Sequence, residues 1–488
     1  MLRGRIRSRS IASMTYVRPA AEYFEKRGLR RHAGVLHLWA LGVGAVISGD
    51  FFGWNFGLTA GGFGGLVSAL GIITVLFAGL CFSIAEMSAA LPHAGGAYSF
   101  ARTSMGTWGG YITGLAENME YILTPAVIVV GVGGYLGAIF GTPEKWEPLW
   151  WVACYVVFVL FNIAGVHLSF RVSVWITLCA LAILGVFYVG AAPRFELRHW
   201  ALENGPWLPK GWYGMLAALP FALWVYLGIE QLPLAAEEAH EPTRDMPKGI
   251  LYGLLTLIAC SFLTVVLNSG LAPGARAIGA SNEPLFLGFR AIFGAGTRTR
   301  LLALFACTGL LASFHAIIYA YGRQIYSLSR AGYFPSWLSV TNGARKTPHR
   351  ALIAGSLLGF AAALAIRIAG QNSAVGATLL NMAVFGAVMA YVLQMASFVL
   401  LRVRFPDIER PYRSPLGIFG AVVAAMIALV TLVLLFLNRD YNLGVVGAAI
   451  WFLCGIGWFA FHARHRLVLS PEEEYALSHR GEEKGVPA

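Results

Sequence analysis

Twelve long apolar runs dominate the 488-residue chain and constrain its fold more than any other feature. A helix needs about 20 apolar residues to cross a bilayer, and these runs are continuous rather than alternating, which argues against a transmembrane β-barrel. Only 12% of the residues are charged, against about 25% in soluble domains. That composition excludes a cytosolic enzyme, a secreted disulfide scaffold and a disordered chain. The sequence predicts an all-α integral membrane protein with twelve transmembrane helices, at residues 38–60, 66–88, 108–140, 149–167, 171–191, 213–233, 248–271, 301–329, 351–368, 376–401, 416–437 and 443–462.

The distribution of basic residues predicts the orientation. Most of the 36 Lys and Arg residues fall in segment 1–37, in alternate loops and in segment 463–488. Cytoplasmic segments carry such an excess, so both termini are predicted to be cytoplasmic. Segment 1–37 lacks an apolar core followed by a cleavage site, and is interpreted as a basic tail against anionic membrane lipid rather than a signal peptide. The net charge of +12 then requires no nucleic-acid partner.

Two predicted spans contain helix-breaking residues. The first has glycines on either side of, and within, Ser48-Gly49-Asp50, and the sixth has Pro220, Gly228 and Pro233. Glycine and proline destabilise a helix interior by about 1 and 3 kcal/mol, and irregular backbone at membrane depth is tolerated only in protein or beside a cavity. Interrupted spans at corresponding places in two halves are typical of inverted-repeat transporters with a midplane binding site. The alternative explanation of these glycines is that they allow neighbouring helices to pack closely.

Five of the 24 acidic residues lie within predicted spans, where a charge costs at least about 2.5–3.5 kcal/mol. They are Asp50, Glu86, Glu117, Glu120 and Glu230. Apart from Lys248, the first residue of the seventh predicted span, no lysine lies within a span, so these acids are expected either to be protonated or to pair with a cation that enters. Glu117 and Glu120 share one helix face. Asp50 is the strongest candidate to bind a cation, supported by Glu117 or Glu120, whereas Glu86 near a helix end is interpreted as structural.

Aromatic and hydroxyl side chains around these acids complete the predicted site. An aromatic face attracts a cation by roughly 0.5–2 kcal/mol, and Ser48 or Tyr226 is expected to bond a substrate hydroxyl. Sodium coupling is the less favoured alternative to proton coupling, and Ser313 would then be a hydroxyl ligand for the sodium ion. The predicted substrate-binding residues are Ser48, Gly49, Asp50, Phe51, Glu117, Glu120, Thr124, Trp224, Tyr226 and Phe314, with Glu230 and His315 in gating or proton linkage.

The sequence gives little support for catalysis or a resident metal. The six cysteines lie in apolar stretches without paired spacing, so neither a disulfide framework nor a metal site is predicted. The HExxH and GxSxG motifs are absent from the sequence. We therefore expect no cofactor and no enzymatic activity, although a membrane-embedded lyase or protease, and a channel, are alternatives that transport assays can separate.

Three spaced motifs resemble those of the amino acid–polyamine–organocation (APC) permeases. They are AEMSAALPHAGGAY at 85–98, EEAHEPTRDMPK at 237–248, and RAGYFP at 330–335, followed by Thr347-Pro348. Within this superfamily, SGDFFGWNFG at 48–57, GLAEN at 114–118 and YILTPA at 121–126 are most similar to the bacterial ethanolamine permeases.

The resemblance implies a LeuT-like fold in the inner (plasma) membrane of a bacterium. Helices one to five (38–191) would form a first repeat, helices six to ten (213–401) an inverted second repeat, and 416–462 two further helices. A small amine would lie between broken helices one and six, with Trp224 as an aromatic gate over it and Glu230 linked to gating or protonation. The expected assembly is a monomer or a homodimer.

One departure from the superfamily pattern bears on the substrate. Amino acid carriers of this type have a Gly-Ser-Gly break whose amide groups receive a substrate carboxylate. Here the stretch reads Ser48-Gly49-Asp50, which places a carboxylate where that of the substrate would lie and would repel an amino acid. We therefore expect import of ethanolamine by alternating access, with proton coupling left open; an amino acid or polyamine permease or exchanger is the alternative.

Overall fold

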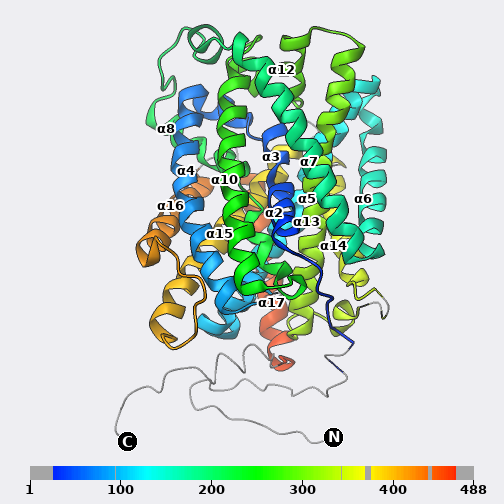
Figure 1. Cartoon of the computed structure of the whole chain (residues 1–488), viewed down its shortest axis with the longest axis vertical. Helices are drawn as coiled ribbons and strands as arrows, with labels where there is room; N and C mark the ends of the chain where they lie inside the picture. The colour runs from blue at the N-terminus through cyan, green and yellow to red at the C-terminus, as the bar shows by residue number, and fades with distance from the viewer. Residues whose placement is uncertain are drawn as a thin grey trace, which may run out of the picture.

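The computed structural model describes residues 23, 26–93, 95–341, 343, 345–368, 375–437 and 442–468. Within these residues the chain is helical, and the only pairing of extended segments is one bridge between Ala33 and Ala239. The long helices stand side by side in a single bundle (Figure 1). Most of the two predicted tails, residues 1–37 and 463–488, falls outside the described residues.

The prediction of twelve spans is confirmed. Among the described residues, eleven helices are long and apolar enough to cross a membrane, and the shorter apolar segment Val35–Phe51 supplies the remaining span. The first half consists of α2 (Val35–Val46), α3 (Ser48–Phe51), α4 (Phe56–Ala90), α5 (Gly96–Phe140), α6 (Glu147–Ala164) and α7 (Val166–Ala191). The second half consists of α8 (Gly211–Ala217), α9 (Leu219–Trp224), the 3-10 helix η4 (Ile229–Glu238), α10 (Pro242–Ser269), α13 (Thr297–Arg330), α14 (His349–Ile368) and α15 (Val375–Arg404). Two further helices follow it, α16 (Gly417–Leu437) and α17 (Asn442–Phe461).

The predicted boundaries around the second and third spans lie close to breaks in the helices. The backbone of α4 is non-helical at Gly62, with φ of 72°, between the predicted end of the first span at 60 and the predicted start of the second at 66. The backbone of α5 is non-helical at Gly106, with φ of 81°, two residues before the predicted start of the third span at 108, and glycine adopts such positive φ values without strain. Two short helices in the connection before α13 were not predicted: α11 (Ala275–Gly279) and α12 (Pro284–Phe293).

The bundle has a buried centre and an apolar outer face. Most of α5 and α13 is enclosed by other helices, whereas α6, α14 and α17 expose most of their apolar surface, as expected for helices that face lipid. We call the end of the bundle where α2 begins and α17 ends the basal end, and the opposite end, where α3 ends and α4 begins, the apical end (Figure 1).

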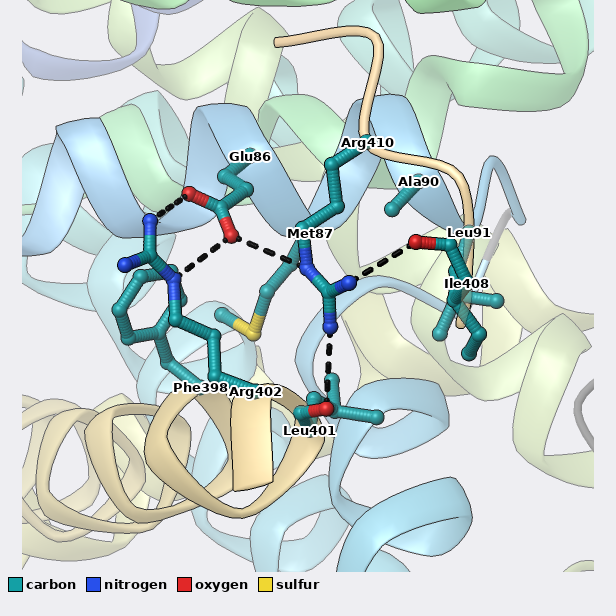
Figure 2. A pocket seen from close by; sticks show the side chains of 9 residues that line it. All are labelled: Glu86, Met87, Ala90, Leu91, Phe398, Leu401, Arg402, Ile408 and Arg410. Atoms are coloured by element: carbon teal, nitrogen blue, oxygen red, sulfur yellow. Dashed lines mark hydrogen bonds and ion pairs between the residues drawn. The ribbon is translucent and has the colours of Figure 1, made fainter. Parts of the chain in front are cut away.

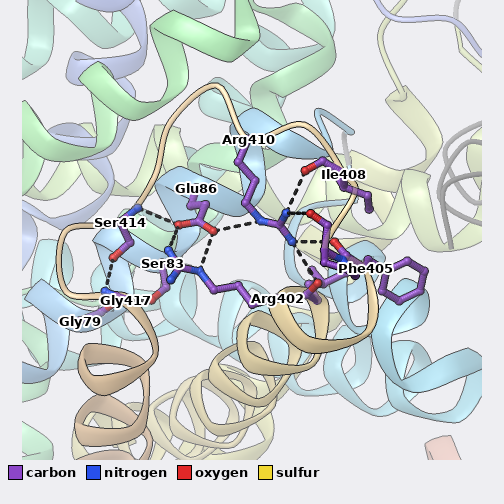
Figure 3. Close-up of polar contacts among 11 residues, drawn as sticks. Gly79, Ser83, Glu86, Arg402, Phe405, Ile408, Arg410, Ser414 and Gly417 are labelled. Carbon is purple, nitrogen blue, oxygen red and sulfur yellow. Dashed lines mark hydrogen bonds and ion pairs between the residues drawn. The ribbon is translucent and has the colours of Figure 1, made fainter. Parts of the chain in front are cut away.

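At the basal end, Glu86 fastens α4 to the connection between α15 and α16. Its carboxylate accepts two bonds from Arg402, at 2.9 and 2.6 Å, and one from the backbone N–H of Ser414 at 2.7 Å. The guanidinium of Arg410 is 3.3 Å away and also donates to the carbonyls of Phe405 and Ile408 (Figure 3). Glu86, Arg402 and Arg410 line a small pocket (Figure 2). A buried carboxylate so fully paired is a structural element, as the sequence suggested for Glu86.

Candidate substrate site

The two interrupted spans touch each other at their interruptions. A Cβ built on Gly49 would lie 2.8 Å from the Cα of Val225 and 2.9 Å from the carbonyl oxygen of Trp224. Gly49 belongs to α3, and Val225 directly follows the end of α9. Only a residue without a side chain allows the two backbones this contact. The predicted site between the first and sixth spans is therefore one continuous junction.

The first interruption lies beside Ser48-Gly49-Asp50, although these residues themselves form the helical turn α3. Helix α2 ends at Val46, and Ile47 forms the short break. The N–H of Ser48 donates to Ser313 Oγ at 2.8 Å, and Ser313 Oγ donates to the carbonyl of Gly44 at 2.7 Å. Ser313 on α13 thus satisfies backbone groups that the break leaves open.

The second interruption is longer. Helix α9 ends at Trp224, Gly228 has φ of 113°, and the chain continues as η4 with Pro233 inside it. The carboxylate of Glu230 accepts the N–H of Gly228 through both oxygens, at 3.1 and 3.0 Å. A carboxylate is well suited to the free N–H groups at the start of a helical segment. Glu230 therefore stabilises the start of η4.

Trp224 joins the two interruptions at their apical side. Its indole Nε1 donates to the carbonyl of Phe52 at 2.9 Å, and its ring lies directly against Gly53, whose φ is 99°. The aromatic rings of Phe52, Phe56 and Phe221 continue this layer, with centroid separations of 5.6 and 6.0 Å along the series. The layer covers the junction of Gly49 and Val225.

Asp50 is buried without a charge partner. Its side chain is 1% exposed, and neither carboxylate oxygen has a hydrogen-bond partner within the described part of the chain. The side chain of Thr264 lies beside the carboxyl, and the hydroxyls of Tyr188 and Tyr226 lie within electrostatic range of it. Burying an unpaired carboxylate is expensive, so this position is adapted to a group that supplies a charge or a proton.

Three further buried acids form a separate cluster. Glu117 Oε2 accepts from Gln324 Nε2 at 2.7 Å, and the carboxyls of Glu120 and Glu230 face each other and Tyr391. Both oxygens of Glu120 lack a hydrogen-bond partner among the described residues. The ion pairs of the described residues all lie elsewhere. We call Glu117, Glu120 and Glu230 the carboxyl cluster.

Asp50 and the carboxyl cluster are distinct groups, contrary to the expectation that Glu117 or Glu120 supports Asp50 directly. The ring of Phe77 on α4 lies 5.2 Å from that of Tyr226, which is within electrostatic range of Asp50, and 5.6 Å from that of Tyr391, which faces Glu230. Phe77 therefore packs between these two tyrosine rings. The shared helix face of Glu117 and Glu120 was a sound prediction, but it did not determine which other helix that face meets.

Tyr226 is occupied by protein contacts. Its hydroxyl lies 2.8 Å from Thr74 Oγ1 on α4 and accepts from Ser261 Oγ on α10 at 2.9 Å. The hydroxyl expected to bond a substrate instead ties the sixth span to the second and seventh.

The remaining predicted residues take different positions. Phe51 packs against Gly309 on α13 and its carbonyl accepts from Tyr135 at 2.8 Å. Thr124 donates to the carbonyl of Glu120 within its own helix.

Phe314 packs on Tyr155 with rings 4.9 Å apart. His315 bonds Asn162 and Ser169 on α6 and α7. The structure thus places Phe314 and His315 on the α6 and α7 side of α13, away from the carboxyl cluster.

Sequence reasoning missed the polar residues that face the acids from other helices. Thr264 and Tyr188 face Asp50, and Gln324 and Tyr391 face the carboxyl cluster. Ser261 and Thr264 stand three residues apart within the apolar stretch 257–267 of α10, so the pattern of hydroxyls one turn apart was a usable signal. For Tyr188 and Tyr391 no comparable pattern exists, because tyrosine is common in apolar spans.

No group of three or more His, Cys, Asp or Glu residues is arranged to hold a metal ion, as far as the described residues extend. The site is therefore considered through its carboxyl, hydroxyl and aromatic groups.

Comparison with known proteins links this arrangement to membrane transport. A family model described as amino acid permease matches residues 34–461. An uncharacterized transporter of Rhizobium meliloti is 29% identical, over 89% of this chain and 94% of its own length. The branched-chain amino acid permease BcaP of Bacillus subtilis is 26% identical, over 90% and 94%. A methylthioribose transporter of Bacillus subtilis is 24% identical, over 91% and 96%. The family match extends across all the membrane-spanning helices of the described residues.

Proposed function

The chain belongs to the amino acid permease family, and we propose that within this family it is a secondary transporter that imports ethanolamine. The family and its named relatives are transporters rather than enzymes, and this chain is a multi-pass membrane transporter. The all-helical architecture with an interrupted first and sixth span fits the family. The substrate, its coupling and the orientation are our proposal.

The observation that carries the choice of substrate is the unpaired carboxylate of Asp50 at the junction of the two interruptions. An ammonium group would supply the missing charge partner, and an ion pair in the membrane interior is far stronger than in water. An amino acid would bring a second carboxylate into the same space, where like charges repel. Ethanolamine carries an ammonium and a hydroxyl only. The hydroxyls of Thr264 and Tyr188 face Asp50 and are suited to orient its carboxyl.

Alternating access is supported by the way the interrupted spans are tied to their neighbours. Tyr226 connects the sixth span to α4 and α10 by hydrogen bonds, and α2 packs along α10. Spans one, two, six and seven therefore form one hydrogen-bonded group. We propose that this group rocks against the other helices, with Trp224 and its aromatic layer closing the apical side over the amine.

The carboxyl cluster is the proposed site of proton linkage. Three carboxylates without a cation would repel one another strongly in the membrane interior, so we propose that the cluster holds at least one proton. Glu230 stands at the start of η4, so a change in its charge would act on the second interruption itself. Proton exchange there would couple transport to pH.

We propose that the basal end faces the cytoplasm. Arginines at that end include Arg323, Arg330, Arg402 and Arg410, in line with the excess of basic residues on the cytoplasmic side of membrane proteins.

An amino acid permease is the second candidate. It is supported by the family model and by the similarity to BcaP, whose printed name is branched-chain amino acid permease. A polyamine would also satisfy the carboxyl groups. Amino acids carry a carboxylate, whereas polyamines and ethanolamine do not. Asp50 is proposed to exclude substrates that carry one.

The test is uptake of radiolabelled ethanolamine into proteoliposomes that contain the purified protein, with glycine, serine, leucine and putrescine as competitors. We expect saturable ethanolamine uptake that Asp50→Asn weakens at least tenfold while leaving the protein folded. Preference for serine or leucine over ethanolamine would establish the amino acid permease instead. Unchanged ethanolamine affinity in Asp50→Asn would remove Asp50 from the site.

A further inference from the structure

Four histidines meet at the basal end, outside the substrate site. His32 precedes α2, His37 lies in α2, His167 lies at the start of α7, and His240 lies between η4 and α10. The ring of His32 is at centroid distances of 4.2 Å from His167, 5.5 Å from His37 and 6.3 Å from His240. We call these residues the histidine cluster. It joins three parts of the chain that lie far apart in sequence.

The central contact of the cluster depends on protonation. His167 Nδ1 and His32 Nε2 are 2.7 Å apart. A ring nitrogen donates only when it carries a proton and accepts only when it does not. This hydrogen bond therefore requires one of the two nitrogens to be unprotonated. His37 Nδ1 likewise accepts the N–H of Gly34. If His32 and His167 were both charged, two N–H groups and two positive charges would face each other.

Among the described residues, no acidic group is near enough to His32 to raise its pKa. The titratable groups that face it are His167, His37 and His240, together with Arg171. Burial lowers the pKa of His32 from its ordinary value, and the neighbouring imidazoles and Arg171 lower it further. Because this pKa is lowered in the assembled cluster, the stabilisation is present at neutral pH and is lost as the pH falls.

Glu238 connects the histidine cluster to α13. Its backbone carbonyl accepts the N–H groups of His32 and Ala33 at 2.7 and 2.8 Å, and His240 N–H donates to the carbonyl of Ala33 at 2.8 Å. The carboxylate of Glu238 is fully buried and pairs with Arg323 at 3.0 Å and with the hydroxyl of Tyr319. One residue thus holds the segment before α2 through its backbone and α13 through its side chain.

The cluster also crosses between moving and fixed elements of the proposed cycle. His32, His37 and His240 lie on or beside α2, η4 and α10, which belong to the proposed moving group, whereas His167 belongs to α7. The bond between His32 and His167 therefore closes the basal end across that boundary.

We propose that the histidine cluster is a pH-sensitive latch on the basal gate, closed when its imidazoles are neutral and released when the adjoining solution turns acidic. Release separates His32 from His167 and loosens the segment bound to Glu238, so that the basal end opens more often. This proposal rests on the proposed transport cycle but not on the identity of the substrate.

Labelling of a single cysteine tests the latch without any substrate. In a variant without the six native cysteines, Ala236→Cys places a thiol at a buried position of η4. The rate at which an impermeant maleimide labels this thiol is measured in vesicles with the basal end outward. Dividing it by the labelling rate of Glu241→Cys, at an exposed position, removes the pH dependence of the thiol reaction itself. We expect this ratio to rise several-fold between pH 7.5 and pH 5.5.

The combined change His32→Gln and His167→Gln, whose side chains are neutral at every pH, is expected to abolish that rise. His199→Gln, at an exposed position in the connection between α7 and α8, is the matched control and should keep it. A flat ratio in the parent protein, or an equal rise in the double variant, would overturn the latch. Loss of ethanolamine uptake in the assay above, with the pH-dependent labelling intact, would overturn the proposed substrate alone.

Discussion

Gly49 and Val225 are the residues through which the two interrupted spans touch, with 2.8 Å between the Cα of Val225 and the place where a Cβ of Gly49 would stand. The contact leaves no room for a methyl group, and the nearest atoms belong to backbone rather than to flexible side chains. The junction therefore depends on this glycine for its geometry as well as on Asp50, the next residue, for its charge.

Gly49→Ala is expected to lower uptake by about tenfold or more, because overpacking costs about 1–3 kcal/mol and here it would separate α3 from residue 225. The measurement is initial uptake at equal amounts of protein in the membrane. Gly71→Ala is the control, since nothing lies within 4 Å of the Cβ it would add. Equal uptake by both variants would contradict the close contact.

Trp224→Phe is expected to weaken substrate affinity by a few-fold, because it keeps an aromatic ring but removes the bond to the carbonyl of Phe52, and such bonds contribute about 1 kcal/mol. Trp224→Ala should have a larger effect, since it opens the aromatic layer. Affinity is measured by competition with labelled substrate. Trp207→Phe removes a similar indole bond, to Ser68, and should bind substrate normally; a matching loss there would point to a general effect on folding.

Thr264→Val and Tyr188→Phe are each expected to weaken binding of an amine several-fold without abolishing transport, because each removes a hydroxyl that faces or supports the Asp50 carboxyl. Thr264 and Tyr188 also bond each other at 2.8 Å, so their effects should be less than additive. A double-mutant cycle on amine affinity measures this coupling. Ser269→Ala, whose hydroxyl bonds only the carbonyl of Val265 in its own helix, serves as the control.

Glu86→Gln is expected to lower stability rather than substrate affinity. Removing one partner of a buried ion pair typically costs about 3–5 kcal/mol, and here Arg402 and Arg410 would both lose their carboxylate (Figure 3). Thermal unfolding in detergent measures the loss. Glu241→Gln breaks a pair with Arg244 in which both side chains are largely exposed, and should leave the unfolding temperature nearly unchanged. Normal stability of Glu86→Gln would show that the network is dispensable.

Glu238→Gln is expected to open the basal end at every pH, in contrast to the histidine variants. Within the described part of the chain, Nε and Nη1 of Arg323 already lack hydrogen-bond partners, so the loss of the Glu238 charge would leave a buried guanidinium unpaired. Cysteine labelling at position 236, as above, reports the opening. Labelling that stays low at pH 7.5 would argue against a gate at this ion pair.

Much of the architecture follows from local sequence properties. The long apolar runs predicted each span, since a helix that crosses a membrane must satisfy its backbone within itself. Glycine marked the turn directly after α3 and the second interruption for the same reason, because Gly53 and Gly228 adopt positive φ that other residues avoid. The exact end of the first span was less predictable, as Ser48, Gly49 and Asp50 form a helical turn in spite of the glycine.

Local sequence properties did not predict which of the buried acids lie together. Asp50, Glu117, Glu120 and Glu230 were recognisable as buried acids, because carboxylates are rare in apolar spans. Their separation into Asp50 and the carboxyl cluster depends on how the helices that carry them pack together. The expected substrate contacts of Tyr226 were likewise replaced by bonds to Thr74 and Ser261.

The sequence by itself determined the membrane location, the number of spans, the two interruptions and the presence of unpaired acids, since each of these depends on residues close together in the chain. Only the tertiary structure decided that Gly49 meets Val225, that Thr264 and Tyr188 face Asp50, and that His32 meets His167. Those pairs lie on helices brought together by packing, and the period of one helix defines which face a residue occupies but not which other helix packs against it.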